Sequence, residues 1–359
     1  MNFSAADMVL QLIRIALCNA EKLSKKLSDS DWDEVYSYAC KQAVTGICFA
    51  GIQRLPKEQI PYKHLLMKWF GQTEHIRIMN SRVDQQTAKV WSILYDAGFN
   101  AAILKGQGIA TLYGELSTYR TTGDIDVWVS GGFDVVNKFV QETIPTKDLA
   151  YHRFHYGMFQ DTEVELHFRP TLMRNLLDDV RLQKWCKSFE QETFVMTDKG
   201  FMMPPLTFNR VFILTHIYRH FLFEGIGMRQ LIDYYFVLKS EVLDAKAKTE
   251  LMSLFKSFRL TRFVQAIMWI MQSAFGLEDN YLLCTPNVKE GQFVLSEVLQ
   301  TGNFGHNETR YQGFSTFNRM SVHGLHLISH YPSEVLWTPV WLLYHKIWKF
   351  NKLRKTKKI

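Results

Sequence analysis

The stretch Gly123-Asp124-Ile125-Asp126-Val127-Trp128-Val129 lies in the first half of a chain of 359 residues and indicates its fold. Acidic and apolar residues alternate in it, and the pattern stops at Ser130-Gly131-Gly132, which is typical of a β-strand that ends in a turn. Positions i and i+2 of a strand lie on one face, roughly 6.5–7 Å apart at Cα. Two carboxylates so placed can share Mg²⁺ ions, which stabilise phosphoryl transfer, although the same spacing is also common on a solvated strand face.

The residues around this strand predict a small region that mixes strands and helices. Residues 101–104 form a short apolar run, which is typical of a buried strand. Residues 133–143 can form a helix, and two strand-like runs follow at 152–160 and 162–168. This region is too small for a doubly wound sheet, so we expect an α+β fold with a small mixed sheet.

Helical patterns flank this region on both sides. Before it, a Ser/Asp N-cap at 30–34 and an apolar stripe from Trp69 to Leu94 predict helices, and Gly98 is expected to end the second one. After it, residues 209–240 are the clearest helical stretch, and residues 301–316 read as a loop. We therefore expect an N-terminal helical region at 1–98, a core at 99–170, and a C-terminal helical domain with a basic tail at 171–359.

A second motif, Leu104-Lys105-Gly106-Gln107-Gly108, follows the first predicted strand. Small residues there let backbone amides approach a phosphate, and Lys105 adds a mobile positive charge. Arg120 precedes Asp124 by four residues and can hold a phosphate oxygen. The glycines do not form a Walker A loop, because the order Gly-x4-Gly-Lys-Ser/Thr is absent. Glu165, on a predicted strand, is the candidate for a third carboxylate.

Taken together, these motifs resemble a known family. The span with Leu-Lys-Gly at 104–106, Tyr113, Arg120 and the Gly-Asp-Ile-Asp-Val of 123–127 resembles the uncharacterised bacterial nucleotidyltransferases of the DNA polymerase β superfamily. Glu165-Leu166-His167 resembles a later motif of that family. One departure is the turn, where Lys105-Gly106 replaces the Gly-Ser or Gly-Gly of the wider superfamily, so the usual serine contact to the triphosphate is in doubt.

The resemblance implies a metal-dependent transfer of a nucleoside monophosphate from an NTP to the hydroxyl of an unknown acceptor. It implies Mg²⁺ or Mn²⁺ as the cofactor, and a polymerase-β-like core flanked by helical regions. The metal-binding and catalytic residues would be Asp124, Asp126 and Glu165. The nucleotide-binding residues would be Lys105, Gly106, Arg120 and Gly123.

Another group of polar residues lies in the C-terminal half. His216 and His220 are four residues apart and share a helix face, and Gly225-Ile226-Gly227-Met228-Arg229 follows them. They either pack the helices or line a pocket for the acceptor or nucleotide, to which we assign His167, His216, His220, Arg229 and Asp233. Zinc is not expected, because Ile217 stands where a His-Glu-x-x-His site has glutamate.

The charge of the chain is concentrated at one end. The net charge is +7, and the segment 346–359 holds seven lysines and arginines and no acidic residue. The rest is formally neutral, so no specific nucleic-acid partner is inferred. The five scattered cysteines have no Cys-x-x-Cys pair and, with no signal peptide or membrane span expected, favour a cytoplasmic protein.

Two other classes of function stay open. A degenerate nucleotidyltransferase fold can serve as a nucleotide-binding or partner-binding module. Alternatively, Trp337, Trp341, Ile347 and Trp348 with the lysines after them can form a helix on a membrane surface, as in a peripheral component of a surface-polysaccharide system. A packed terminal helix with a solvated basic end is the simpler interpretation of that segment.

Overall fold

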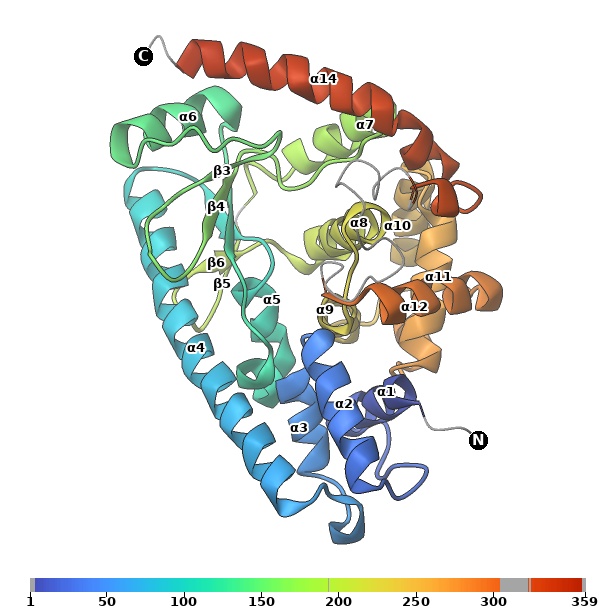
Figure 1. Cartoon of the computed structure of the whole chain (residues 1–359). Coiled ribbons are helices and arrows are strands. Elements are labelled where there is room, and N and C mark those ends of the chain that lie inside the picture. The colour runs from blue at the N-terminus through green and yellow to red at the C-terminus, as the bar shows by residue number, and fades with distance from the viewer. Residues whose placement is uncertain (1–3, 193, 304–321, 323, 357–359) are drawn as a thin grey trace.

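The structure, a computed structural model, describes residues 4–192, 194–303, 322 and 324–356. A small mixed sheet lies among helices, which make up most of the described chain, and the predicted α+β class is confirmed (Figure 1). The predicted loop at 301–316 lies mostly outside the described residues. Within the described residues, no helix combines the length and apolar character that crossing a membrane requires.

The N-terminal helices begin and end at residues suited to capping. They are α1 (Ala5–Ala16), α2 (Asp29–Lys41), α3 (Thr45–Ile52), the 3₁₀ turn η1 (Lys57–Gln59) and α4 (Lys63–Asp96). Helix α2 begins earlier than predicted, because Ser28 and Asp31 form a reciprocal capping box. Helix α4 ends as predicted, with Gly98 at φ +83° and the Phe99 amide donating to the carbonyl of Leu94.

The sheet has the strand order β1-β2-β4-β3. Its strands are β1 (Ala101–Ile103), β2 (Ile125–Val129), β3 (Arg153–His155) and β4 (Val164–His167). Strand β2 runs antiparallel to β1 and parallel to β4, which is antiparallel to β3. The four strands lie within the predicted runs, but β3 covers only the start of its run. Helices α5 (Gln107–Ala110), η2 (Thr111–Tyr119) and α6 (Gly132–Thr143) connect the first strands.

The alternation of strand residues separates an apolar face of the sheet from the face that carries the polar groups. Ile125, Val127 and Val129 of β2 join a hydrophobic cluster with residues of α4 and α6. Trp128 points to the other face, where its ring stacks on Phe208 at 5.0 Å. Because Asp126 alternates in the same way, its carboxylate lies on the face of Trp128, toward the C-terminal helices.

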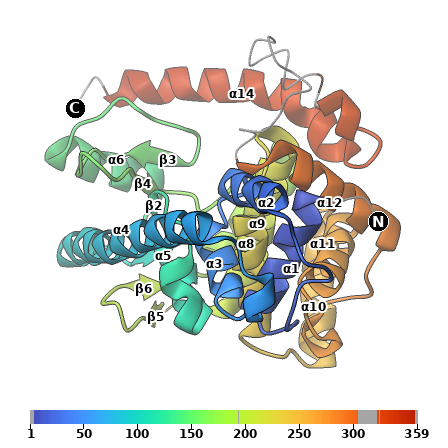
Figure 2. The ribbon, with the colours of Figure 1, turned by 60° about the horizontal axis from the view of Figure 1, so that its bottom comes forward.

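Helices dominate the rest of the described chain. They are α7 (Leu176–Lys187), α8 (Leu206–Phe223), α9 (Met228–Lys239), α10 (Ala245–Ser257), α11 (Thr261–Ser273), η3 (Asp279–Tyr281), α12 (Val288–Thr301) and α14 (Pro332–Thr356), with a short hairpin of β5 (Val195–Met196) and β6 (Met202–Met203). Helices α1–α3 share one hydrophobic cluster with α8, α9 and α11, so the N-terminal helices pack against helices that follow the sheet. Two views place α14 beside α6 (Figures 1 and 2).

Candidate active site

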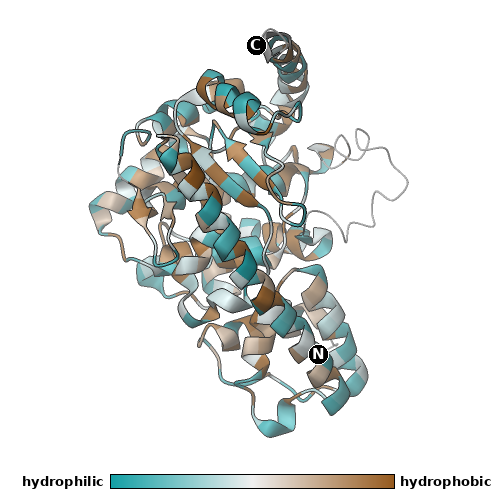
Figure 3. Ribbon diagram, turned by 90° about the vertical axis from the view of Figure 1, so that its left-hand side faces the viewer, coloured by the Kyte–Doolittle hydropathy of each residue, from teal (hydrophilic) through white to brown (hydrophobic). Residues whose placement is uncertain are grey.

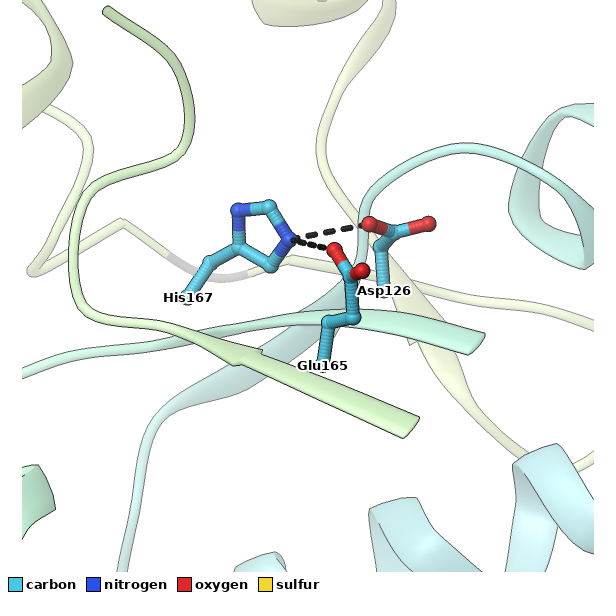
Figure 4. A group of neighbouring side chains, drawn as sticks. All are labelled: Asp126, Glu165 and His167. Carbon is cyan, nitrogen blue, oxygen red and sulfur yellow. Dashed lines mark hydrogen bonds and ion pairs between the residues drawn. The ribbon is translucent and has the colours of Figure 1, made fainter. Parts of the chain in front are cut away.

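Asp126 and Glu165 lie opposite each other on neighbouring parallel strands, because the register of β2 and β4 pairs them. His167, two residues further along β4, shares their face of the sheet. Its Nε2 atom lies 2.9 Å from Oδ1 of Asp126 and 3.2 Å from Oε2 of Glu165 (Figure 4). All three side chains are buried, and their possible ligand atoms lie within 4.8 Å of one another. Carboxylates and an imidazole in this arrangement can hold a divalent cation.

The ammonium group of Lys105 lies between the two aspartates of the Asp-x-Asp motif. Its Nζ atom is 3.0 Å from Oδ2 of Asp126 and 3.2 Å from Oδ2 of Asp124. Lys105 follows β1, which pairs with β2, so the sheet itself brings the ammonium group to these carboxylates. A cationic group thus bridges the two aspartates, so their carboxylate oxygens share one positive charge.

Burial and charge act on the pKa values of this cluster in opposite directions. Burial raises the pKa of Asp126, but the charge of Lys105 and the hydrogen bond from His167 more than offset this and hold that pKa well below its usual value. Burial lowers the pKa of Lys105, and the surrounding carboxylates raise it above its usual value. Burial, together with the charge of Asp126, raises the pKa of Glu165 although His167 opposes it. Glu165 therefore accepts a proton more readily than an ordinary glutamate.

Arg153 forms an ion pair with Glu165, and it was not among the predicted site residues. Its Nη1 atom lies 2.9 Å from Oε1 of Glu165. The register of β3 against β4 pairs Arg153 with His167, which places the arginine on the polar face of the sheet. The alternation Arg153-Phe154-His155 was the signal available in the sequence, but the pairing of β3 with β4 is needed to interpret it.

Helices α8 and α9 form the second wall of a pocket in front of Asp124. The core side of this pocket is lined by Lys105, Gly106, Arg120, Gly123 and Asp124, and the helical side by Ile213, His216, Ile217, Arg229, Gln230 and Asp233. The structure thus brings together the two predicted groups of polar residues, one from each half of the chain. Gly106 has φ +57°, a conformation that favours glycine, so its backbone can turn at the edge of the pocket.

Arg229 lies directly behind Gly123. A β-carbon at position 123 would lie 3.5 Å from Nη1 of Arg229, and this atom donates to the carbonyl oxygens of Thr121 at 3.2 Å and Thr122 at 3.0 Å. Burial and the charge of Arg120 lower the pKa of Arg229. Among the described residues no carboxylate lies within ion-pair distance of Arg229, so its charge is available to an anion in the pocket.

Arg120 has partners that differ from the phosphate contact we expected. Its Nε and Nη2 atoms donate to the two carboxylate oxygens of Asp233 at 2.7 and 2.8 Å, and the Tyr113 hydroxyl donates to Asp233 at 2.6 Å. All three side chains are buried. This bidentate pair joins the core to α9, so it holds the second wall of the pocket in place. Arg120 and Asp233 both line the pocket, but their charges neutralise each other.

The two predicted histidines of α8 belong to a buried chain of polar groups. The Nε2 atoms of His216 and His220 lie 3.1 Å apart, and Arg219 donates toward His220 at 2.9 Å and His152 at 3.1 Å. The ring of His152 lies 5.1 Å from that of His167. Burial is the main cause that lowers the pKa of His152, His216 and His220, so each loses its proton more readily than an ordinary imidazole. His216 lines the pocket, and His220 stands behind it.

Comparison with known proteins gives one family. The family model described as "Uncharacterised nucleotidyltransferase" matches residues 28–276, which is more than half of the chain and includes the whole sheet, α8 and α9. Searches of the curated proteins and of the solved structures gave no match. The matched range contains every predicted site residue. The chain therefore belongs to this family of uncharacterised nucleotidyltransferases.

Proposed function

We propose that this protein transfers a nucleoside monophosphate from an NTP to an acceptor hydroxyl in a metal-dependent reaction. The observation that carries the proposal is the buried group of Asp126, Glu165 and His167, which Lys105 joins to Asp124 at the edge of a pocket that Arg229 also lines. The small sheet with its acidic strand would serve as a polymerase-β-like core, and family membership supports an NTP as the donor.

Asp124, Asp126 and Glu165 would hold Mg²⁺ or Mn²⁺, with His167 as a further ligand. When bound, such ions neutralise the charge that develops on the phosphate oxygens. Asp126 suits this role because its low pKa favours the ionised carboxylate that a metal ion requires. Lys105, which now pairs with the aspartates, could pair with a phosphate instead when the ion is bound. The metal site and the phosphate site would thus share Lys105.

The pocket residues would bind and orient one phosphate group of the NTP. Lys105 and Arg229 would pair with phosphate oxygens, and the backbone at Gly106 and Gly123 would lie close to them. Arg120 and Asp233 would hold α9, and with it Arg229, in position. His216 would face the nucleotide or the acceptor, with His220 supporting it from behind. Positioning and charge stabilisation supply most of the catalysis in phosphoryl transfer.

The chemical step would be a substitution at the α-phosphorus atom. The acceptor oxygen forms a bond to this atom, the bond to the bridging oxygen of pyrophosphate breaks, and pyrophosphate leaves with that oxygen's electron pair. The proton of the acceptor hydroxyl would pass to the carboxylate of Glu165, which acts as the general base.

Calorimetric titration with a non-hydrolysable NTP analogue tests the binding site. We expect binding that requires Mg²⁺ or Mn²⁺, and its loss in Asp126→Asn. Asp96→Asn, a change on the exposed end of α4, is the matched control and should bind as the unchanged protein does. Equal affinity with and without the metal ion, or in Asp126→Asn, would contradict the proposed site and would favour a module that binds without catalysis.

A further inference from the structure

One face of α14 is fixed against the core of the protein. Trp341 packs on Tyr151 with ring centres 6.1 Å apart, and Trp348 packs on Tyr151 at 5.0 Å and on Phe133 at 5.8 Å. At the start of the helix the buried carboxylate of Glu334 accepts from the backbone amide of Arg174 at 2.7 Å. These contacts along the helix determine which of its faces points outward.

The outward face of α14 is apolar, which is unusual for a surface helix. Leu336, Val340, Leu343 and Ile347 follow one another at spacings of four, three and four residues, so they form one stripe along three turns. Each of the four is between 49% and 62% exposed. Apolar and polar segments interleave along this helix in Figure 3. A packed surface helix normally presents polar residues outward, and an exposed apolar stripe marks a site of interaction.

The charged residues that α14 carries after Glu334 are all positive, and one of them, Lys352, pairs with Asp134 of α6. From residue 335 to residue 359 the sequence holds lysines and arginines and no Asp or Glu, and Glu334 is buried. Lys346 is exposed and Lys349 is half-buried, both on the helix that carries the stripe. A second copy of this helix would bring the same positive charges together. The surface that matches is therefore one that is anionic and offers an apolar layer beneath its charges.

We propose that α14 docks through this stripe on an anionic phospholipid bilayer, lying in the plane of the interface. The stripe would enter the boundary of the acyl chains, while the lysines would contact the anionic headgroups. No helix among the described residues could cross a bilayer, so the contact would be peripheral. This property is independent of the proposed nucleotidyl transfer, because α14 contributes no residue to the pocket.

Flotation of the full-length protein with vesicles tests the proposal. We expect binding to vesicles of phosphatidylcholine mixed with phosphatidylglycerol, weaker binding to phosphatidylcholine alone, and a decrease as salt rises. Leu343→Glu with Ile347→Glu should reduce binding to the anionic vesicles by about tenfold or more, since two side chains leave the acyl boundary. Lys346→Gln with Lys349→Gln should reduce the preference for anionic vesicles.

Two exposed apolar residues of α4 provide the matched control. Met67 and Ile78 are 59% and 66% exposed, so Met67→Glu with Ile78→Glu makes the same chemical change away from α14 and should bind vesicles as the unchanged protein does. Circular dichroism checks that each variant is folded. Absence of binding by the unchanged protein, or equal binding by the Leu343→Glu/Ile347→Glu variant, would overturn the proposal. A dimer in solution that this variant abolishes would also overturn it, in favour of self-association.

Discussion

The Nζ atom of Lys105 lies 3.0 Å from Oδ2 of the buried Asp126. This ion pair joins the segment that follows β1 to the start of β2, and its two residues belong both to the folded sheet and to the proposed active site. Lys105 balances the charge of the carboxylate cluster, and it lines the pocket in which a phosphate group of the NTP would bind. Changing it should therefore alter both stability and binding.

Lys105→Met should lower the free energy of unfolding by about 3 kcal/mol without metal, because it leaves buried carboxylates without their counter-ion. Added Mn²⁺ should raise the melting temperature of this variant more than that of the unchanged protein, since no ammonium group competes for Asp124 and Asp126. Thermal unfolding with and without Mn²⁺ measures both effects. An equal shift by the metal ion in the two proteins would show that Lys105 and the ion do not share these oxygens.

Arg229 and Arg120 line the same pocket but should respond differently to substitution. Arg229→Ala should weaken NTP-analogue binding about tenfold or more, with little change in melting temperature, because its guanidinium has no carboxylate partner among the described residues. Arg120→Ala should instead destabilise the fold by about 3–5 kcal/mol, since it leaves Asp233 buried and unpaired. Calorimetry and thermal unfolding separate the two results. Unchanged affinity in a folded Arg229→Ala variant would remove Arg229 from the phosphate site.

His167→Gln should change the metal preference of the site. Mg²⁺ takes oxygen ligands almost exclusively, whereas a transition-metal ion gains from an imidazole nitrogen. We therefore expect Mn²⁺ affinity to fall by about tenfold or more in this variant and Mg²⁺ affinity to change little. Titration of both ions by calorimetry makes the comparison, with His155→Gln, on the half-exposed edge of the same sheet, as the control. An equal loss for both ions would mean that His167 only orients Asp126 and Glu165.

Glu334 at the start of α14 should make stability depend on pH. Burial raises its pKa from 4.5 to about 7, although the amides of Arg174 and Asn175 oppose the shift. The folded chain thus holds this proton more tightly than the unfolded chain, so the free energy of unfolding falls as pH rises from about 4.5 to about 7, by about 3 kcal/mol in total. Glu334→Gln should flatten that part of the curve. Urea unfolding across this pH range measures the free energy of unfolding. If this energy falls with pH as steeply in Glu334→Gln as in the unchanged protein, Glu334 is not the group responsible.

The local patterns of the sequence predicted the parts of the site that lie on single elements. The alternation around Asp126 and Glu165 predicted two strands with carboxylates on one face, and their parallel pairing brings these side chains together. The stripe of α4 and its glycine stop were predicted in the same way, since they depend on residues a few positions apart.

The partners of the site residues could not be predicted, because they come from distant parts of the chain. Arg120 was assigned to phosphate from its position before Asp124, but it pairs with Asp233, 113 residues later. Arg153 was missed because its role depends on which strand β3 joins. His167 was assigned to the acceptor or nucleotide pocket, whereas its Nε2 atom lies within hydrogen-bond distance of both Asp126 and Glu165.

An NTP labelled in its α-phosphate tests the proposed transfer most directly. The protein is incubated with Mn²⁺, each labelled NTP in turn and a cell extract as the source of acceptor, and label and pyrophosphate are followed by chromatography. We expect label to move to a new product with one pyrophosphate released for each label transferred, and neither change to occur with Asp126→Asn. Label that stays in the NTP, appears only in nucleoside diphosphate, or moves equally with Asp126→Asn would contradict nucleotidyl transfer at this site.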